Sequence, residues 1–171
     1  MRKDTWRGFL WPVSKFKSFI KFWLPVIIWA GLIFSASSDK KSVHHSSRII
    51  EPFVRWLLPD ISDHALRTTV LVVRKCAHVT EFAIFTLLLR RAANATVWKF
   101  NTPWNGKAAT FAFVVSVLFA TTDEIHQCFV PGRQGAVMDV AIDSTGAACA
   151  LFIIWLWAKR KKLPQNSNQK A

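Results

Sequence analysis

The chain is poor in the residue patterns that organise disulfide-rich or thiolate-metal proteins. It holds only three cysteines, Cys76, Cys128 and Cys149, with no CxxC spacing among them. Two of the three lie inside apolar runs, where a cysteine usually acts as a small apolar side chain. The sequence therefore indicates neither a disulfide framework nor a cysteine metal site.

Several signatures of catalysis are also missing. The chain contains no GxSxG nucleophile motif, no glycine-rich phosphate loop and no HExxH pair, and the segment DEIHQ at 123–127 supplies a single histidine. No internal repeat or low-complexity linker is present. These absences argue against a serine hydrolase, a nucleotide-binding fold and a zinc protease of the usual kind, and 171 residues predict one domain.

Acidic residues are scarce beside an unusual amount of apolar sequence. Asp and Glu number 10 against 23 Lys and Arg, so the net charge is +13, although 51% of the residues are hydrophobic. A membrane protein combines these properties naturally, because Lys and Arg flank its long apolar runs. Here the basic residues bracket such runs instead of forming a stripe on one surface, so we predict no nucleic-acid partner.

Four apolar stretches predict an all-α membrane protein, a four-transmembrane-helix bundle. They cover about 19–37, 69–89, 108–129 and 137–158, and each approaches the ~20 residues that cross a hydrocarbon core of about 30 Å. We therefore expect a membrane domain over 19–158. A basic interfacial segment, 1–18, precedes it, and a basic polar tail, 159–171, follows it. No small-residue cleavage site follows the first run, so we expect a retained helix and not a signal peptide.

The basic residues predict the orientation of these helices. They concentrate before the first stretch, between the second and third, and after the fourth, which places both termini on the cytoplasmic side. Two termini on one side require an even number of crossings, so the charged stretch 69–89 must also span. Apolar residues at helical spacing over 42–58 predict an amphipathic helix on the outer surface, short or kinked at Pro52. Membrane lipids are the expected partners.

Ionisable residues inside the predicted spans share helix faces. Residues spaced by three, four or seven positions lie on one face of a helix. Three such faces carry ionisable or amide side chains: one has Arg74, His78 and Glu81, the second has Asp123, His126 and Gln127, and the third has Asp139 and Asp143. Counting about 1.5 Å per residue from the cytoplasmic basic residues puts Arg74, Asp123 and Asp143 at one height, about 24 Å up. Charges face lipid only at high cost, so we expect these faces to meet in the outer half of the membrane. Gly146 and Ala147 follow Asp143 and should permit close helix packing.

Three blocks in order resemble the VanZ-like family of bacterial membrane proteins, named for a protein linked to teicoplanin resistance. They are RKCAHVTEF at 74–82, DEIHQCFVPGR at 123–133 and DVAIDSTGA at 139–147, and the FSASS end of the first stretch also fits. The resemblance covers roughly 25–157. Phe82 stands where the family usually has Tyr. The resemblance implies a bacterial cytoplasmic (inner) membrane protein of the cell envelope, and it does not by itself imply antibiotic resistance.

The charged cluster supports one purely structural interpretation and three functional ones. In the structural interpretation, the cluster is an ion-pair network that holds the helices together. The first functional hypothesis is binding of an amphiphilic or lipid-linked anionic ligand, such as a lipoglycopeptide or a cell-wall intermediate, from the outer leaflet. Charge-assisted hydrogen bonds would hold its head group, with these candidate ligand-binding residues: Arg74, Lys75, Gln127, Arg133, Asp139 and Asp143.

The second hypothesis is an intramembrane hydrolase or transferase that acts on lipid-linked phosphates. A histidine would serve as general base beside carboxyl groups that act as acid, orienting group or metal ligand, and the candidates are His78, Glu81, Asp123, Glu124 and His126. The sequence does not identify a cofactor and leaves open whether a metal ion binds. The third hypothesis is a small proton-coupled transporter, for which four spans without repeats suffice only if the chain oligomerises.

Overall fold

The computed structural model describes residues 13–38, 42–98, 103–130 and 136–162, and the chain in these ranges is helical apart from its turns. The elements in order are α1 (Val13–Ser38), α2 (Ser42–Leu57), α3 (Asp63–Ala93), the short π-helix η1 (Asn94–Trp98), α4 (Gly106–Cys128) and α5 (Val137–Lys162). The predicted all-α class is confirmed.

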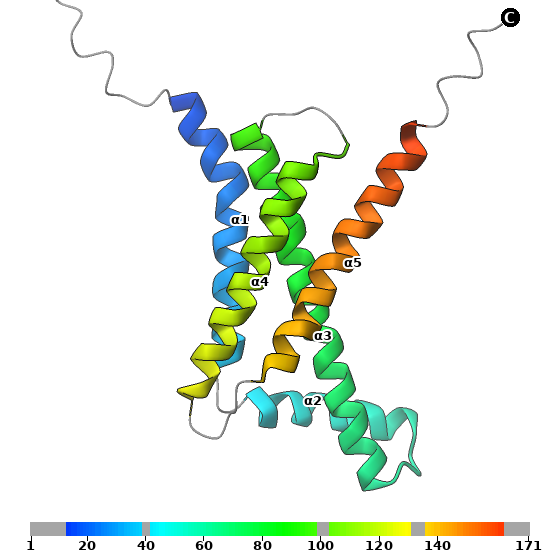
Figure 1. Cartoon of the computed structure of the whole chain (residues 1–171). Coiled ribbons are helices and arrows are strands. Elements are labelled where there is room, and N and C mark those ends of the chain that lie inside the picture. The colour runs from blue at the N-terminus through cyan, green and yellow to red at the C-terminus, as the bar shows by residue number, and fades with distance from the viewer. Residues whose placement is uncertain (1–12, 39–41, 99–102, 131–135, 163–171) are drawn as a thin grey trace, which may run out of the picture.

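The four long helices alternate in direction (Figure 1). α1 and α4 run one way, and α3 and α5 run the other. The start of α1 and the end of α5 therefore lie at one end of the bundle, here called the termini end. Helix α2 lies across the opposite end, here called the α2 end (Figure 1).

Local sequence accounts for where the helices begin. The Ser62 hydroxyl caps α3 by accepting a hydrogen bond from the backbone N–H of Ala65, at 3.3 Å. The Asn105 side chain caps α4 by accepting from the N–H of Lys107, at 3.0 Å. Both satisfy backbone donors that the first helical turn leaves without a partner.

Three helix boundaries differ from the sequence prediction. α1 already begins at Val13, inside the expected interfacial segment, whose residues 1–12 lie outside the described ranges. α3 begins at Asp63, well before 69, and α5 continues into the expected tail as far as Lys162. Helix α2 runs for 16 residues with Pro52 in its interior, where the proline removes one helical hydrogen bond.

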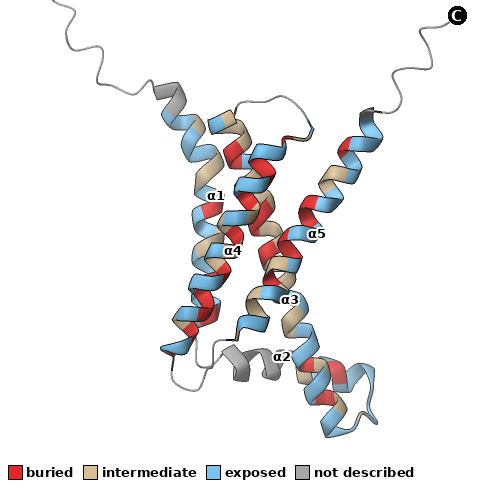
Figure 2. Ribbon diagram, in the orientation of Figure 1, coloured by how far each residue is buried: buried red, intermediate tan, exposed pale blue. Residues whose placement is uncertain are grey.

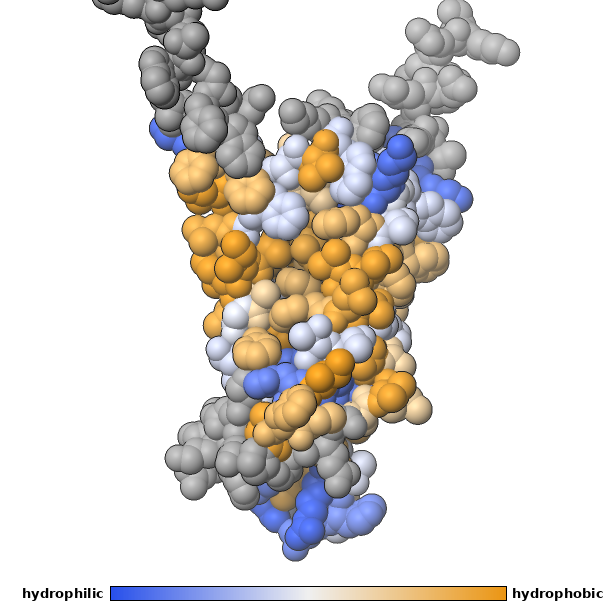
Figure 3. All heavy atoms as spheres, turned by 60° about the vertical axis from the view of Figure 1, so that its left-hand side comes forward, coloured by the Kyte–Doolittle hydropathy of each residue, from blue (hydrophilic) through white to orange (hydrophobic). Residues whose placement is uncertain are grey.

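Three of the described helices are long and apolar enough to cross a membrane: Phe16–Ser37 within α1, Gly106–Cys128, which is α4, and Val137–Lys161 within α5. By the same measure α3 is not, because its middle carries Arg74, Lys75 and Glu81. An apolar band lies across the middle of the molecule between hydrophilic ends (Figure 3).

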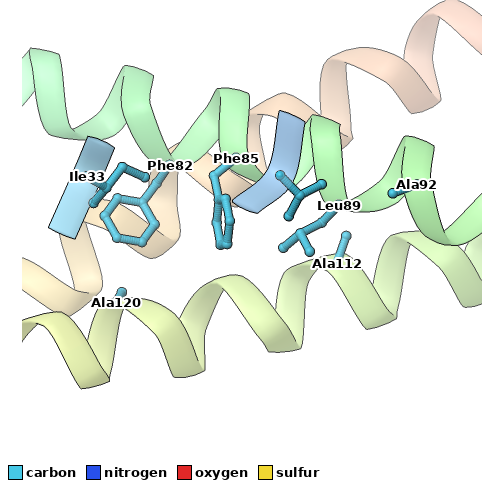
Figure 4. Packing of buried hydrophobic residues seen from close by; sticks show 8 residues of the cluster. Ile33, Phe82, Phe85, Leu89, Ala92, Ala112 and Ala120 are labelled. Carbon is cyan, nitrogen blue, oxygen red and sulfur yellow. The ribbon is translucent and has the colours of Figure 1, made fainter. Parts of the chain in front are cut away.

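The apolar core lies where α1, α3 and α4 meet (Figure 4). Phe82, Phe85 and Leu89 of α3 are at most 3% exposed, and they pack against small α4 side chains such as Ala112 and Ala120. Large apolar side chains elsewhere are exposed: Ile27, Leu118 and Ile153 are 61–63% exposed. Figure 2 shows that exposed positions occur along each long helix. A lipid environment suits this distribution, since soluble proteins rarely expose such continuous apolar surface.

Candidate functional site

Helices α3 and α5 come into backbone contact at Gly146. A Cβ atom added to Gly146 would lie 2.2 Å from the backbone oxygen of Val79 and 2.9 Å from its carbonyl carbon. Only glycine fits there, because real Cβ atoms essentially never approach within 3.0 Å. Ala147 beside it is fully buried. The prediction that Gly146 permits close helix packing is confirmed, and the contact brings the charged parts of α3 and α5 together.

A lysine of α3, one turn before Val79, meets an aspartate of α5, two turns before Gly146. The Lys75 ammonium pairs with Asp139 Oδ1, and the two side chains remain 43% and 28% exposed. Arg74 lies next to Lys75 and is half-buried. This end of the bundle thus holds a cation that is both fixed by a partner and still reachable from outside.

A buried hydrogen-bond network joins α1 to α4. The Ser37 hydroxyl donates to Asp123 Oδ2 at 2.7 Å, and the Gln127 amide donates to both Ser37 Oγ, at 2.8 Å, and Asp123 Oδ2, at 3.0 Å. The same amide lies 3.2 Å from Glu124 Oε1, and Glu124 Oε2 accepts from the backbone N–H of Ala136 at 2.9 Å. These carboxylates are therefore committed to holding α1, α4 and the start of α5 together.

One further carboxyl group, that of Asp143, joins the cluster. Asp143 of α5 is 4% exposed and lies within electrostatic range of Asp123, Glu124, Asp139 and Lys75. Asp123 Oδ1 is buried without a hydrogen-bond partner among the described residues. The cluster is thus rich in carboxyl groups at its buried centre, and its cations lie nearer the surface.

The two histidines occupy different surroundings. His78 Nδ1 lies 3.6 Å from Glu81 Oε2 on α3, and both side chains are partly exposed. The backbone oxygen of Glu81 also accepts from Trp29 Nε1 of α1 at 3.0 Å. His126 of α4 instead packs its ring against Phe34, with the centroids 4.3 Å apart. His78 thus has a carboxylate at ion-pair distance on its own helix.

Comparison with known proteins supports the resemblance seen in the three sequence blocks. A family model described as VanZ/LLP1 matches residues 22–158, which is most of the chain and reaches from within α1 to within α5. The chain belongs to the VanZ/LLP1 family. Neither a curated protein nor a solved structure matches it. The family match and the three apolar helices together make it a membrane protein.

Ten of the eleven candidate site residues of this VanZ/LLP1 protein lie in described helices, on α3, α4 and α5, and Arg133 lies outside the described residues. Sequence reasoning did not include Ser37 among them, although its hydroxyl is fully buried at the centre of the network. The only sequence signal was its place in the FSASS end of the first span. No three His, Cys, Asp or Glu side chains in the described part of the chain are arranged to hold a metal ion.

Proposed function

We propose that this VanZ/LLP1 protein crosses the bacterial cytoplasmic membrane four times, with α3 as the fourth span. α3 has 31 residues, which is about 45 Å of helix and longer than the ~30 Å core requires. It lies among the other helices (Figure 1), so Lys75 can face Asp139 instead of lipid. Its outward positions Leu71, Val72 and Val73 are apolar and 40–56% exposed. The low hydropathy of α3 is therefore compatible with its crossing the membrane.

The distribution of charge supports termini in the cytoplasm. Basic residues crowd the termini end, at the start of α1, the end of α3, the start of α4 and the end of α5: Lys17, Lys21, Arg90, Arg91, Lys107, Lys159, Arg160 and Lys161. No described acidic residue lies in these helix ends. Cytoplasmic flanks carry such an excess of Lys and Arg, so the α2 end would face outward.

At that outer end, the proposed activity is binding of an amphiphilic or lipid-linked ligand with an anionic head group. The observation that carries this proposal is the Lys75–Asp139 pair, which fixes a cation at the surface of the cluster beside Arg74. A phosphate or carboxylate could replace Asp139 as the partner of Lys75, and charge-assisted hydrogen bonds of this kind are the stronger ones. The buried carboxylates of the α1–α4 network would support the site without touching the ligand.

Helix α2 offers an apolar surface for the hydrocarbon part of such a ligand or for the surrounding lipid. Val54 is 8% exposed, whereas Phe53, Trp56 and Leu57 on its other sides are 61–76% exposed. The Phe53 and Trp56 rings lie 6.1 Å apart. An amphipathic helix with aromatic residues on its free face typically lies in the membrane interface.

Binding to the purified full-length protein tests the proposal. The probe is a fluorescent polyprenyl diphosphate, compared with the matching polyprenyl alcohol. We expect Lys75→Gln with Arg74→Gln to weaken diphosphate binding about tenfold or more, since each charge-assisted bond contributes about 1.5–3 kcal/mol. The control is Arg55→Gln, at the same end but in an exposed ion pair with Asp63. Equal binding by wild type and the double variant, at normal expression, contradicts the proposal.

The same variants give a cellular readout of any role in lipoglycopeptide resistance. Expression of the wild-type chain in a sensitive bacterial host should raise the inhibitory concentration of a lipoglycopeptide if that amphiphile is the ligand. The gain should disappear with Lys75→Gln and survive Arg55→Gln. A gain that survives both substitutions separates resistance from the Lys75 site.

The alternative, an intramembrane hydrolase or transferase, is favoured by one observation. His78 Nδ1 lies 3.6 Å from Glu81 Oε2, which is ion-pair distance and longer than a hydrogen bond, and a histidine beside a carboxylate is a candidate general base. Turnover of a polyprenyl diphosphate by the wild type and its loss in His78→Ala would favour the enzyme. Binding without turnover leaves the ligand-binding proposal in place.

A further inference from the structure

The termini end carries basic side chains that rest on aromatic rings instead of acidic partners. Lys159 lies over Trp155 at 4.0 Å, Lys161 over Trp157 at 4.1 Å and Arg90 over Trp104 at 5.5 Å. The ion pairs among the described residues are Arg55–Asp63, Lys75–Asp139 and His78–Glu81, and none of them lies at the termini end. Arg90 also donates to the backbone oxygen of Pro103 at 2.6 Å, but none of these cations has an acidic partner among the described residues.

One aromatic ring at this end serves two cations from different helices. Phe22 of α1 has the Lys21 ammonium 5.7 Å and the Arg91 guanidinium 5.2 Å from its centroid. Lys21 and Arg91 are both exposed, and Phe22 is partly buried against the core. One ring thus has both a lysine of α1 and an arginine of α3 beside it, and neither contact neutralises a charge.

The relative position of the two helices is fixed at this point. Trp23 Nε1 of α1 donates to Thr96 Oγ1 of η1 at 3.0 Å, and the Thr96 hydroxyl donates to the backbone oxygen of Ala92 at 2.8 Å. Trp23 also stacks on Phe19, with the ring centroids 5.6 Å apart. These contacts stop α1 from sliding along α3, so Lys21 and Arg91 stay at one height.

We propose that Lys21, Phe22 and Arg91 form a binding site for the phosphate of an anionic phospholipid, in the leaflet that the termini end faces. The ammonium and the guanidinium would donate to the phosphate oxygens, and the acyl chains would run along the outward apolar faces of α1. Basic sites between membrane helices recognise anionic lipid head groups in this way. The site lies at the opposite end of the bundle from Lys75 and does not depend on the proposed ligand.

Native mass spectrometry of the detergent-purified full-length protein tests this site, after equilibration with equal amounts of phosphatidylglycerol and phosphatidylcholine of the same acyl chains. Wild type should retain phosphatidylglycerol preferentially. Lys21→Gln with Arg91→Gln should reduce its retention about tenfold, whereas Lys21→Arg with Arg91→Lys, which keeps both charges, should preserve it. An excess of inorganic phosphate should not displace the lipid, because the acyl chains contribute to its binding.

The matched control removes two charges from the same end on one helix. Lys159→Gln with Lys161→Gln should change phosphatidylglycerol retention by less than about twofold, because those cations are not braced against a second helix. Unchanged retention in the Lys21/Arg91 glutamine variant overturns the proposal, and so does an equal fall in both pairs, which would indicate nonspecific attraction by net charge.

Discussion

Replacing Gly146 by alanine should separate α3 from α5 and destabilise the bundle. The new methyl group would lie 2.2 Å from the Val79 backbone oxygen, whereas an ordinary contact is 3.4 Å or more, so the helices must move apart by about 1 Å. The obstacle is backbone and cannot rotate away. Overpacking of this kind costs about 1–3 kcal/mol. The glycine-to-alanine change itself favours a helix by up to ~1 kcal/mol, so it partly masks the loss.

Gly31→Ala isolates that helix-propensity term, because a Cβ at Gly31 of α1 meets nothing within 4 Å. Thermal unfolding of both variants in one detergent, followed by the amount of monodisperse protein, gives the comparison. The apparent Tm of Gly146→Ala should fall below that of Gly31→Ala by about 2–12 °C. Equal melting temperatures would refute the close backbone contact between α3 and α5.

Three further predictions test other contacts. Ser37→Ala should destabilise the protein by about 1–3 kcal/mol, because the buried groups of the network lose their partner. The control, Ser35→Ala at an exposed position, should change the stability by less than ~0.5 kcal/mol. Thermal unfolding in detergent compares the two variants. Thr86→Val combined with Ser116→Ala removes the 2.8 Å hydroxyl contact between α3 and α4, and a double-mutant cycle should give a coupling of about 0.6 kcal/mol. Arg55→Gln should leave the Tm within ~2 °C, because its ion pair is exposed; a larger fall would contradict that assignment.

Sequence patterns predicted the features that simple periodicities control. Long apolar runs fix the approximate positions of α1, α4 and α5, because bilayer thickness sets their length. Spacings of three and four residues placed Asp123 and Gln127 on one face, where they are hydrogen-bonded to each other. Gly146 was predictable as a close contact, because a glycine among small residues is typical of tight helix crossings.

The role of Ser37 was not predictable from such patterns. A hydroxyl in a helix usually donates to the carbonyl four residues earlier, as Thr80, Thr121 and Ser144 do here. Ser37 instead donates to Asp123, 86 positions away in sequence, and nothing local specifies this partner. The same reason explains why the pairing of Lys75 with Asp139, among several nearby carboxylates, required the three-dimensional arrangement.

The proposal of four crossings is tested most directly by determining on which side of the membrane the chain emerges after α3. In a variant without the three native cysteines, Leu58→Cys, Gly106→Cys and Lys161→Cys are treated separately with a membrane-impermeant maleimide in intact and permeabilised cells. Four crossings predict that position 58 reacts in intact cells and that positions 106 and 161 react only after permeabilisation. If positions 106 and 161 also react in intact cells, α3 does not cross the membrane, and the proposed outer site around Lys75 is contradicted.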